Sequence, residues 1–394
     1  MTTLPAASVD PGSAGPASHF QPSYRVSRER LLEKLHALSA RHPVLVDSRA
    51  IGPRGPHGET LALDFCIVGA RRPKRALVLS SGTHGVEGYT GSALQHWVLD
   101  VLLPGLRLAD DCALVLQHAN NPYGFAWHRR VDEDNVDLNR NFLDDFDPSR
   151  CPPDYEALYE CLNPVDLDPA NEARRWARIA DYIARHGQRQ FQQVAVEGQY
   201  KFPQGIQFGG QRRGASARHL LALVGEHLRD AESVVWLDIH TGLGESGSCE
   251  LITGAAPDTP AFARAQQAWG GQVHSSYSGD SVSTPVNGLL DLGLAQALPP
   301  GCRFAFAYAE YGTWPPERVL RAMRADNWLH HHGDRGDATG RAIESEMLEA
   351  FRPAAPDWAG AVVAHGASLV ESSVEAANIT DRRCGKRASE RSRR

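Results

Sequence analysis

The sequence lacks the features that direct a chain to a membrane or tie it together with disulfides. No stretch approaches the roughly 18 apolar residues of a membrane-spanning helix, and residues 1–20 have neither the basic nor the apolar segment of a secretory signal. The seven cysteines stand at irregular spacings without a Cys-x-x-Cys pair, which is typical of reduced thiols rather than of a disulfide framework or a zinc knuckle. These absences predict a soluble, cytoplasmic protein.

The sequence also lacks an excess of positive charge. It carries 41 basic and 47 acidic residues, a formal net charge of −6, and both signs are spread along the chain. A nucleic acid or an anionic membrane surface would call for a basic patch. We therefore expect a small-molecule or short peptide substrate and neither nucleic-acid nor membrane partners, while the oligomeric state is not indicated.

The two ends of the chain differ in composition from the remainder. Residues 1–22 are rich in Ala, Ser, Pro and Gly and hold few large apolar groups, so they predict a disordered arm. Residues 373–394 are rich in arginine and predict a basic disordered tail, which either is simply solvated or contacts acidic partners. Residues 23–372 lie between them and are long enough to bury a large core.

Short β-type runs alternate with helical patterns through most of this region. Such alternation favours an α/β fold with a largely parallel sheet covered on both faces. Residues 144–210, rich in Pro, Asp, Gln and Gly, interrupt the alternation and predict a helical insertion or a lid. The expected strands span 63–68, 76–79, 113–117, 234–239 and 304–309, and the expected helices span 27–40, 90–103, 170–186, 215–229 and 316–331.

Three polar clusters follow expected strands. His84 and Glu87 come after the strand at 76–79, Asp238-Ile-His240 ends the strand at 234–239, and Glu310 closes the strand at 304–309. Ligands of open α/β sheets lie at the carboxyl ends of the strands. The coincidence of the three clusters therefore predicts a functional site at this edge.

The spacing of His84 and Glu87 suits a metal ion. An imidazole and a carboxylate three residues apart in a glycine-flanked loop can reach one ion, and a distant third ligand such as His240 leaves a fourth position for water, as in catalytic zinc sites. Taken alone, the pair also fits a surface histidine beside an unrelated glutamate, and His240 also fits a core histidine. The run at 330–332 can be explained by the end of a helix beside Gly333, without a ligand role.

A segment between these clusters resembles the signature of zinc carboxypeptidases. It carries Asn-Pro-x-Gly, then an arginine, then Val-Asp-Leu-Asn-Arg-Asn-Phe, and the family's order of His-x-x-Glu, Asn-Arg, third His and final Glu is preserved over about residues 75–315. The chain thus resembles the zinc carboxypeptidase-like superfamily, which includes metallocarboxypeptidases, succinylglutamate desuccinylases and aspartoacylases. The resemblance is closest to a bacterial branch that carries Ala-Glu-Tyr-Gly-Thr. It implies a three-layer α/β/α fold with a mixed, largely parallel sheet of about eight strands.

The resemblance also implies roles for the site residues. One Zn²⁺ per chain would be held by His84, Glu87 and His240, and Asp137 would fix the tautomer of His84 unless it is merely a turn or cap residue. Glu310 would be the general base for water activated by zinc and would deliver the proton to the leaving nitrogen. Its alternative is a carboxylate paired in the core, which is costly to bury unpaired.

Three further side chains complete the implied site. Arg130 would stabilise the oxyanion that forms on the substrate carbonyl. The spacing alone does not exclude Arg129 in this role. The alternative is that both arginines are solvated and take no part in catalysis. Asn139 and Arg140 would hold a substrate carboxylate, for which arginine offers a bidentate fork.

One element departs from the family pattern. Digestive carboxypeptidases place a tyrosine shortly before the catalytic glutamate, whereas residues 284–290 read Thr-Pro-Val-Asn-Gly-Leu-Leu; Tyr277, Tyr308 and Tyr311 lie elsewhere in the sequence. This departure counts against cleavage of a peptide C-terminus more than against metal-dependent hydrolysis, so an N-acyl amino acid or a specialised amide is expected as the substrate.

The expected function is zinc-dependent hydrolysis of an amide bond. The alternative is a non-catalytic scaffold that binds zinc or a carboxylate ligand. The sequence lacks the His-Glu-x-x-His motif of zincins, and its nearest approach to a Gly-x-Ser-x-Gly elbow, at 244–248, lacks the final glycine.

Overall fold

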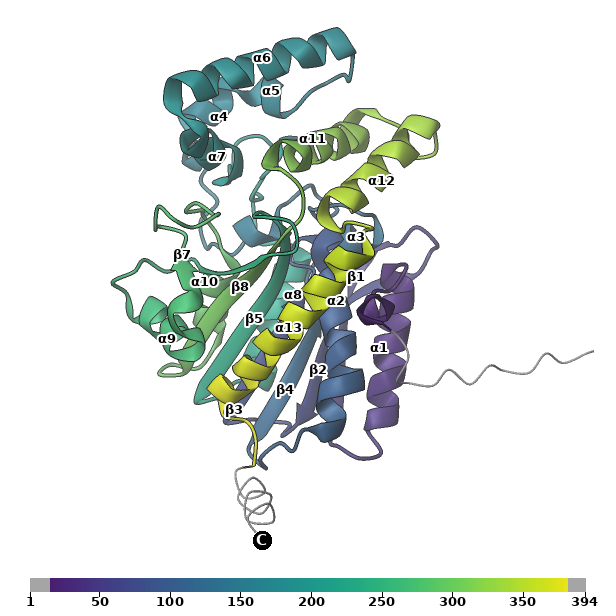
Figure 1. Cartoon of the computed structure of the whole chain (residues 1–394), viewed down its shortest axis with the longest axis vertical. Helices are drawn as coiled ribbons and strands as arrows, with labels where there is room; N and C mark the ends of the chain where they lie inside the picture. Colours follow the sequence, from purple (N-terminus) through teal and green to yellow (C-terminus); the bar gives the residue numbers. More distant parts are fainter. Residues whose placement is uncertain (1–14, 382–394) are drawn as a thin grey trace, which may run out of the picture.

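An eight-stranded mixed sheet forms the centre of the computed structural model, which describes residues 15–381 (Figure 1). The strand order is β1-β2-β4-β3-β5-β8-β6-β7. The strands are β1 (Val44–Arg54), β2 (Thr60–Gly69), β3 (Arg75–Ser81), β4 (Cys112–His118), β5 (Ser233–Gly242), β6 (Cys249–Thr253), β7 (Val273–Ser275) and β8 (Arg303–Gly312).

The middle of the sheet is parallel and its edges are mixed. β4, β3, β5 and β8 run parallel to one another, whereas β1, β2 and β4 form successive antiparallel pairs and β6 is antiparallel to β8. Apart from the first residues of β3 and β5, the strands β3, β4 and β5 are continuous buried runs because helices cover both faces. The fold class expected from the sequence, a mixed and largely parallel sheet of about eight strands, is confirmed.

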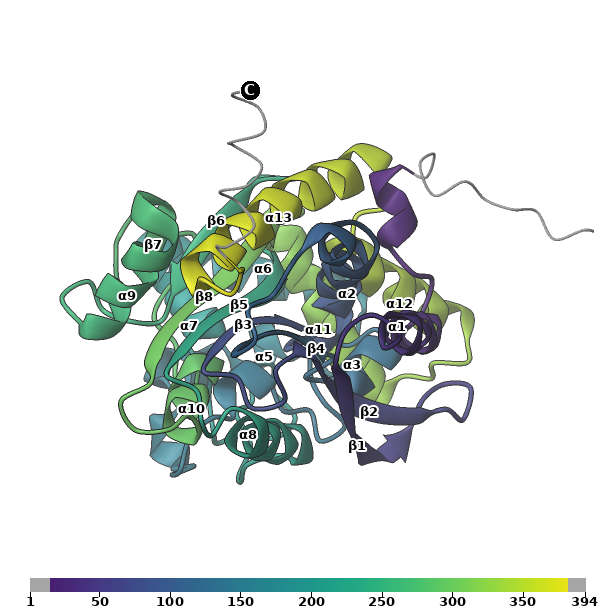
Figure 2. The same ribbon diagram turned by 90° about the horizontal axis from the view of Figure 1, so that it is seen from below.

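Helices cover both faces of the sheet and give three layers (Figure 2). Alternate side chains of each strand point to opposite faces, so Leu77 and Leu79 enter one apolar cluster and Ala76 and Val78 enter the other. The first cluster includes side chains of α1, α2, α9 and α13, and the second includes side chains of α8 and α10. The helices are α1 (Tyr24–Leu38), α2 (Gly88–Trp97), α3 (Pro122–Ala126), α4 (Pro153–Ala157), α5 (Tyr159–Leu162), α6 (Pro169–His186), α7 (Gln188–Val196), α8 (Ala215–His227), α9 (Pro260–Trp269), α10 (Leu290–Ala297), α11 (Pro316–His332), α12 (Ala338–Phe351) and α13 (Pro356–Ala377).

Residues 144–210 form a helical unit above the sheet. Helices α4 to α7 share an apolar cluster of their own, against which Leu320 of α11 also packs. The guanidinium of Arg324 on α11 donates to both carboxylate oxygens of Glu172 on α6 at 2.8 and 2.9 Å. Figure 1 shows α6 and α7 next to α11 at one end of the sheet. The segment is therefore fixed to the rest of the domain.

The chain ends differ in part from their expected boundaries. The predicted arm (1–22) and tail (373–394) lie largely outside the described residues, but residues 16–19 form a short 3-10 helix and α13 continues to Ala377. The extension of α13 is explained by burial of Ser373, Val374 and Ala377 against the sheet. Within residues 15–381, no helix has the length and apolar character needed to cross a bilayer.

Candidate metal centre

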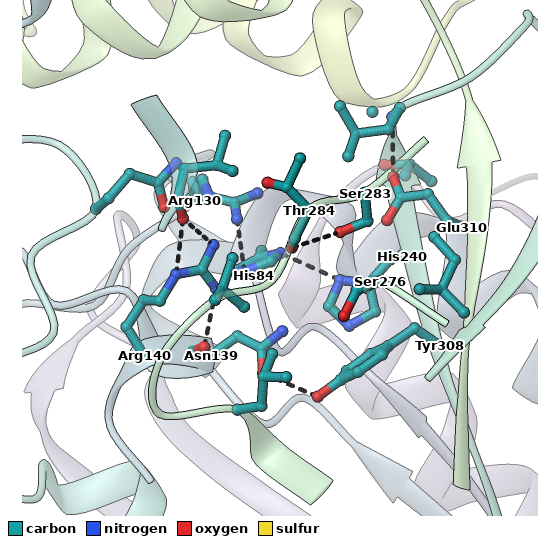
Figure 3. A pocket seen from close by; sticks show the side chains of 18 of the residues that line it. His84, Arg130, Asn139, Arg140, His240, Ser276, Ser283, Thr284, Tyr308 and Glu310 are labelled. Atoms are coloured by element: carbon teal, nitrogen blue, oxygen red, sulfur yellow. Dashed lines mark hydrogen bonds between the residues drawn. The ribbon is translucent and has the colours of Figure 1, made fainter. Parts of the chain in front are cut away.

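Three neighbouring parallel strands bring the polar clusters together. β3, β5 and β8 are adjacent, and the register pairs Ser81 with Ile239 and His240 with Glu310. The carboxyl ends of these strands therefore meet at one edge of the sheet. His84, His240 and Glu310 all line one cavity of about 120 Å³ at that edge (Figure 3).

The loop after β3 is shaped by glycines. Gly82 adopts a positive φ of 67°, and a Cβ on Gly85 would lie 2.1 Å from the carbonyl carbon of Gly124. The chain can therefore turn sharply and pack against α3, which aims His84 at the cavity. Glu87 follows at the start of α2, where the amino end of a helix favours a negative charge.

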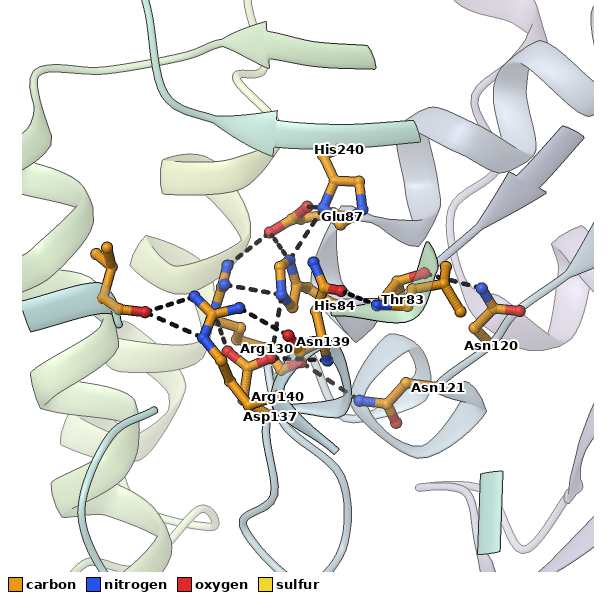
Figure 4. Close-up of polar contacts among 12 residues, drawn as sticks. Thr83, His84, Glu87, Asn120, Asn121, Arg130, Asp137, Asn139, Arg140 and His240 are labelled. Carbon is orange, nitrogen blue, oxygen red and sulfur yellow. Dashed lines mark hydrogen bonds and ion pairs between the residues drawn. The ribbon is translucent and has the colours of Figure 1, made fainter. Parts of the chain in front are cut away.

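His84, Glu87 and His240 present one ligand atom each to a common point (Figure 4). The two Nδ1 atoms are 3.1 Å apart, His84 Nδ1 is 2.9 Å from Glu87 Oε1, and His240 Nδ1 is 3.1 Å from Glu87 Oε2. Ligands of a tetrahedral zinc ion at 2.0–2.1 Å stand about 3.3 Å from one another. All three side chains are buried, and their atoms suit zinc in kind and in spacing.

The protonation of the His240 ring also suits a metal ion at this point. Its Nε2 lies 2.6 Å from Asp238 Oδ2, and because a carboxylate only accepts, Nε2 carries the proton. In the neutral ring Nδ1 is then an unprotonated acceptor that faces the acceptor Glu87 Oε2. A positive charge is needed between two such acceptors. Without a metal ion, a proton on Nδ1 supplies this charge: burial alone would lower the pKa of His240, but Asp238 and Glu87 outweigh burial and raise the pKa to about 10.

Asp238 is a site residue to which the sequence analysis gave no role. Besides His240, its carboxylate accepts hydrogen bonds from the hydroxyls of Ser80 at 2.5 Å and Thr83 at 2.8 Å. Thr83 in turn accepts from the side-chain amide of Asn120. The His240 ring is thus held by a buried polar network, as is usual for histidines that bind metals.

Asp137 lies behind His84, where the sequence placed it. Its Oδ1 is 3.2 Å from His84 Nε2, and the same oxygen accepts from the backbone N–H of Asn139 at 2.9 Å. The proposed contact and the alternative cap role therefore occur together. Burial would raise the pKa of Asp137, but Arg130 and His84 hold it well below its usual range.

The structure separates the two adjacent arginines. The guanidinium of Arg130 lines the cavity and lies 2.9 Å from Glu87 Oε1, 3.2 Å from Asp137 Oδ2 and 2.8 Å from His84 Nε2. Arg129 points away and is buried in an ion pair with Asp326 at 3.0 Å. Of the two candidates for an oxyanion role, Arg130 is the one beside the cavity.

Glu310 lies at the cavity with one oxygen anchored. Its Oε1 accepts the backbone N–H of Leu243 at 2.9 Å. Burial, and after it the charge of Glu87, raises the pKa of Glu310 to about 7. A carboxyl group with a pKa near neutrality can both accept and return a proton.

Asn139 and Arg140 line the same cavity, but their polar atoms are partly engaged. Arg140 donates to the carbonyl oxygens of Val196 and Asn139, and Asn139 Oδ1 accepts the backbone N–H of Leu290. Burial lowers the pKa of Arg140. Both side chains are therefore held in place at the cavity wall by the backbone.

The cavity lining also includes polar atoms that no sequence motif indicated. Ser276 Oγ and Thr284 Oγ1 are buried without a hydrogen-bond partner in the described part of the chain, and such atoms often mark a binding function. Of the three tyrosines considered, Tyr308 lines the cavity, edge-on to His240 with ring centroids 5.1 Å apart. Tyr277 is exposed and Tyr311 is buried, and neither lines the cavity.

Other histidines and acidic groups do not join this site. Residues 330–332 form the last turn of α11, as expected, and belong to no group of potential ligands between residues 15 and 381. Asp47, Glu226 and His227 also lie close together, but Arg49 donates to both Asp47 and Glu226 and already supplies the cation.

Several solved structures are similar to this chain. Carboxypeptidase A from Helicoverpa armigera is 13% identical, with a TM-score of 0.44 over 86% of this chain and 77% of that one. Bovine thrombin-activatable fibrinolysis inhibitor is 12% identical, with a TM-score of 0.42 over 89% and 99%. Succinylglutamate desuccinylase from Chromobacterium violaceum is 17% identical, with a TM-score of 0.36 over 85% and 76%. They include the carboxypeptidase and desuccinylase types that the sequence motifs resemble, and at these identities they carry no statement on activity.

Comparison of the sequence with profiles of known families identifies the family of this chain. No curated protein matches the chain. The sequence profile of one family matches residues 20–365, a span that includes His84, Glu87, His240 and Glu310. The chain therefore belongs to the family described as Protein of unknown function (DUF2817).

Proposed function

We propose that this protein is a zinc-dependent hydrolase that cleaves an amide bond. The observation that carries the proposal is that the Nδ1 atoms of His84 and His240 converge with the Glu87 carboxylate, and that both histidines line one cavity together with Glu310. His84, Glu87 and His240 would hold one Zn²⁺ per chain. Bound there, zinc would supply Lewis-acid polarisation of a carbonyl group and would lower the pKa of water.

Glu310 is the proposed general base. With a pKa of about 7, a large fraction of this carboxyl is ionised at neutral pH. Leu243 anchors Oε1, so the other oxygen is the one to take a proton from the attacking water. As the C–O bond forms and the C–N bond breaks, the same oxygen would return that proton to the leaving nitrogen, which makes the products a carboxylic acid and an amine.

Arg130 is proposed to stabilise the developing oxyanion. Its guanidinium already lies at the cavity beside Glu87, and cationic donors fixed in a buried site stabilise negative charge more than they do in water. Asn139 and Arg140 are proposed to bind a substrate carboxylate, together with the Ser276 and Thr284 hydroxyls of the same cavity, which have no hydrogen-bond partner among residues 15–381. A substrate that joins an amide to a carboxylate, such as an N-acyl amino acid or a peptide C-terminus, fits these groups.

The substitution Glu310→Gln tests this proposal against the alternative of a binding scaffold. Hydrolysis of a panel of N-acyl amino acids and short peptides should fall by about 100-fold or more, because general-base catalysis typically contributes about 10²–10⁴-fold, while zinc stays bound. The matched control is Glu232→Gln. Glu232 is exposed and precedes the first residue of β5, whereas the site lies at the carboxyl end of that strand. Wild-type protein that binds zinc but hydrolyses nothing in the panel would favour the scaffold, and undiminished hydrolysis by Glu310→Gln would refute the role of Glu310.

A further inference from the structure

A second, larger cavity adjoins the candidate metal centre. It encloses about 450 Å³ between α6, α7 and α11, which is within the range of pockets for small ligands. Five residues line both cavities: Val196, Gln207, Leu243, Val319 and Met323. Leu243 is also the residue whose backbone N–H anchors Glu310. The two cavities are therefore neighbours that share these residues as a common boundary.

The walls of this second cavity are largely apolar. Trp176, Ile179 and Ile183 of α6 face Phe191 of α7 and Leu320 of α11. Its charged side chains, Glu317 and Arg321, are partners of one another at 2.8 Å, and the Arg321 guanidinium also stacks 3.8 Å from the Trp176 ring. The two charges of this pair offset each other and the remaining side chains of the lining are uncharged, so the cavity suits an uncharged apolar group.

The walls are held rigidly. The buried guanidinium of Arg324 fixes α11 to Glu172 of α6 and also donates to the carbonyl oxygen of Cys161 at 2.7 Å. Gln192 and Gln193 of α7 donate to backbone carbonyls of residues 282 and 285, in the loop that carries Thr284. The cavity is thus a preformed part of the domain.

Gln207 stands at the junction of the two cavities with an unsatisfied oxygen. It is only 3% exposed, its Oε1 has no partner among the described residues, and its φ of 58° is unusual for a residue with a side chain. The neighbouring Ile206 holds this conformation, since its N–H donates to Asn163 and its carbonyl accepts from Tyr155. A strained backbone and a buried unpaired acceptor together are typical of a ligand contact.

Resting on the proposed function, we propose that the substrates are N-acyl amino acids with a large apolar acyl group. The acyl chain occupies the cavity between α6, α7 and α11, while the amino-acid carboxylate lies toward Asn139 and Arg140. Gln207 Oε1 accepts a hydrogen bond from an N–H of the substrate at the junction.

Binding of an N-acylglycine series, from acetyl to decanoyl, tests this inference. Isothermal titration calorimetry is done in a Glu310→Gln background, so that the ligands are not consumed. Each buried methylene should tighten binding by up to about fourfold. Ala180→Trp should abolish this dependence, because Ala180 is exposed and lines the cavity, so that the indole can fill the space without disturbing the core. Ala184→Trp, on the same helix and outside the lining, is the matched control and should retain it.

The outcomes separate this inference from the proposed function. Affinity that does not depend on chain length, or that responds equally to Ala180→Trp and Ala184→Trp, overturns the acyl pocket even if wild-type protein hydrolyses N-acyl amino acids. Length-dependent binding lost only in Ala180→Trp supports the acyl pocket even if hydrolysis fails, in which case the proposed function is wrong and N-acyl amino acids are ligands rather than substrates.

Discussion

Replacing Asp238 by Asn tests how the protein prepares His240 for a metal ion. The carboxylate accepts three hydrogen bonds, from Ser80, Thr83 and the Nε2–H of His240 at 2.5, 2.8 and 2.6 Å. An asparagine has a single acceptor oxygen. Placed at the Oδ2 position, this oxygen lacks the negative charge behind His240; if the amide nitrogen stands there instead, an N–H donor faces both Thr83 and His240. The ring must then accept at Nε2 and carry its proton on Nδ1, the atom that faces Glu87.

We expect Asp238→Asn to bind zinc more weakly than the wild type. Loss of the partner behind a metal-binding histidine typically weakens binding by about 10–100-fold, which corresponds to about 1.4–2.7 kcal/mol. Zinc dissociation constants are measured on untagged, metal-free protein by competition with a chelating indicator. Thermal unfolding of the metal-free protein is followed by circular dichroism, so that a loss of fold is distinguished from a loss of affinity.

Asp132→Asn is the matched control for this experiment. Asp132 is also buried, its hydrogen bonds go to the backbone of Asp134 and Val136, and burial raises its pKa to about 8, so the substitution removes little charge at neutral pH. It should leave zinc affinity unchanged. A zinc affinity of Asp238→Asn within about twofold of wild type would refute the tautomer argument.

Three further outcomes are expected. Arg129→Ala should lower the free energy of unfolding by about 1.5–3 kcal/mol in urea titrations, because it removes buried hydrogen bonds to Asp326 and Asn135 and leaves Asp326 only its ion pair with Arg335 at 3.3 Å; a change below about 1 kcal/mol would contradict this. The rate constant kcat/KM should rise with pH as Glu310 ionises, because only its ionised form accepts a proton, and burial and the charge of Glu87 shift its pKa upward; a profile that does not fall toward acid pH would count against Glu310 as the base. Gly85→Ala should destabilise the fold by about 1–3 kcal/mol and weaken zinc binding, since its Cβ would meet Gly124 at 2.1 Å, and an unchanged melting temperature would contradict that packing.

The strand-end residues were predictable from sequence because the sheet geometry is simple. Each of His84, His240 and Glu310 follows a buried apolar run, and parallel neighbours place such ends at one edge. The position of Asp238 could also have been predicted from the sequence. Residues two apart on a strand point to the same face, so its side chain had to lie beside His240.

Other features could not be obtained in this way. Arg129 and Arg130 are adjacent, so motif spacing does not choose between them, and only the fold shows which one turns into the core. Gln207, Ser276 and Thr284 come from loops whose path depends on the packing of distant helices. The edge strand β1 was missed because its exposure alternates irregularly and its sequence contains Gly52 and Pro53. The strands β6 and β7 are too short for a clear period.

Elemental analysis of protein purified without a histidine tag tests the central claim most directly. We expect about one zinc per chain in the wild type, lost together with hydrolysis in His84→Ala, and retained in His332→Ala, an exposed histidine at the end of α11. Wild-type protein without zinc even after reconstitution, or zinc that persists in His84→Ala, would contradict the proposed metal centre.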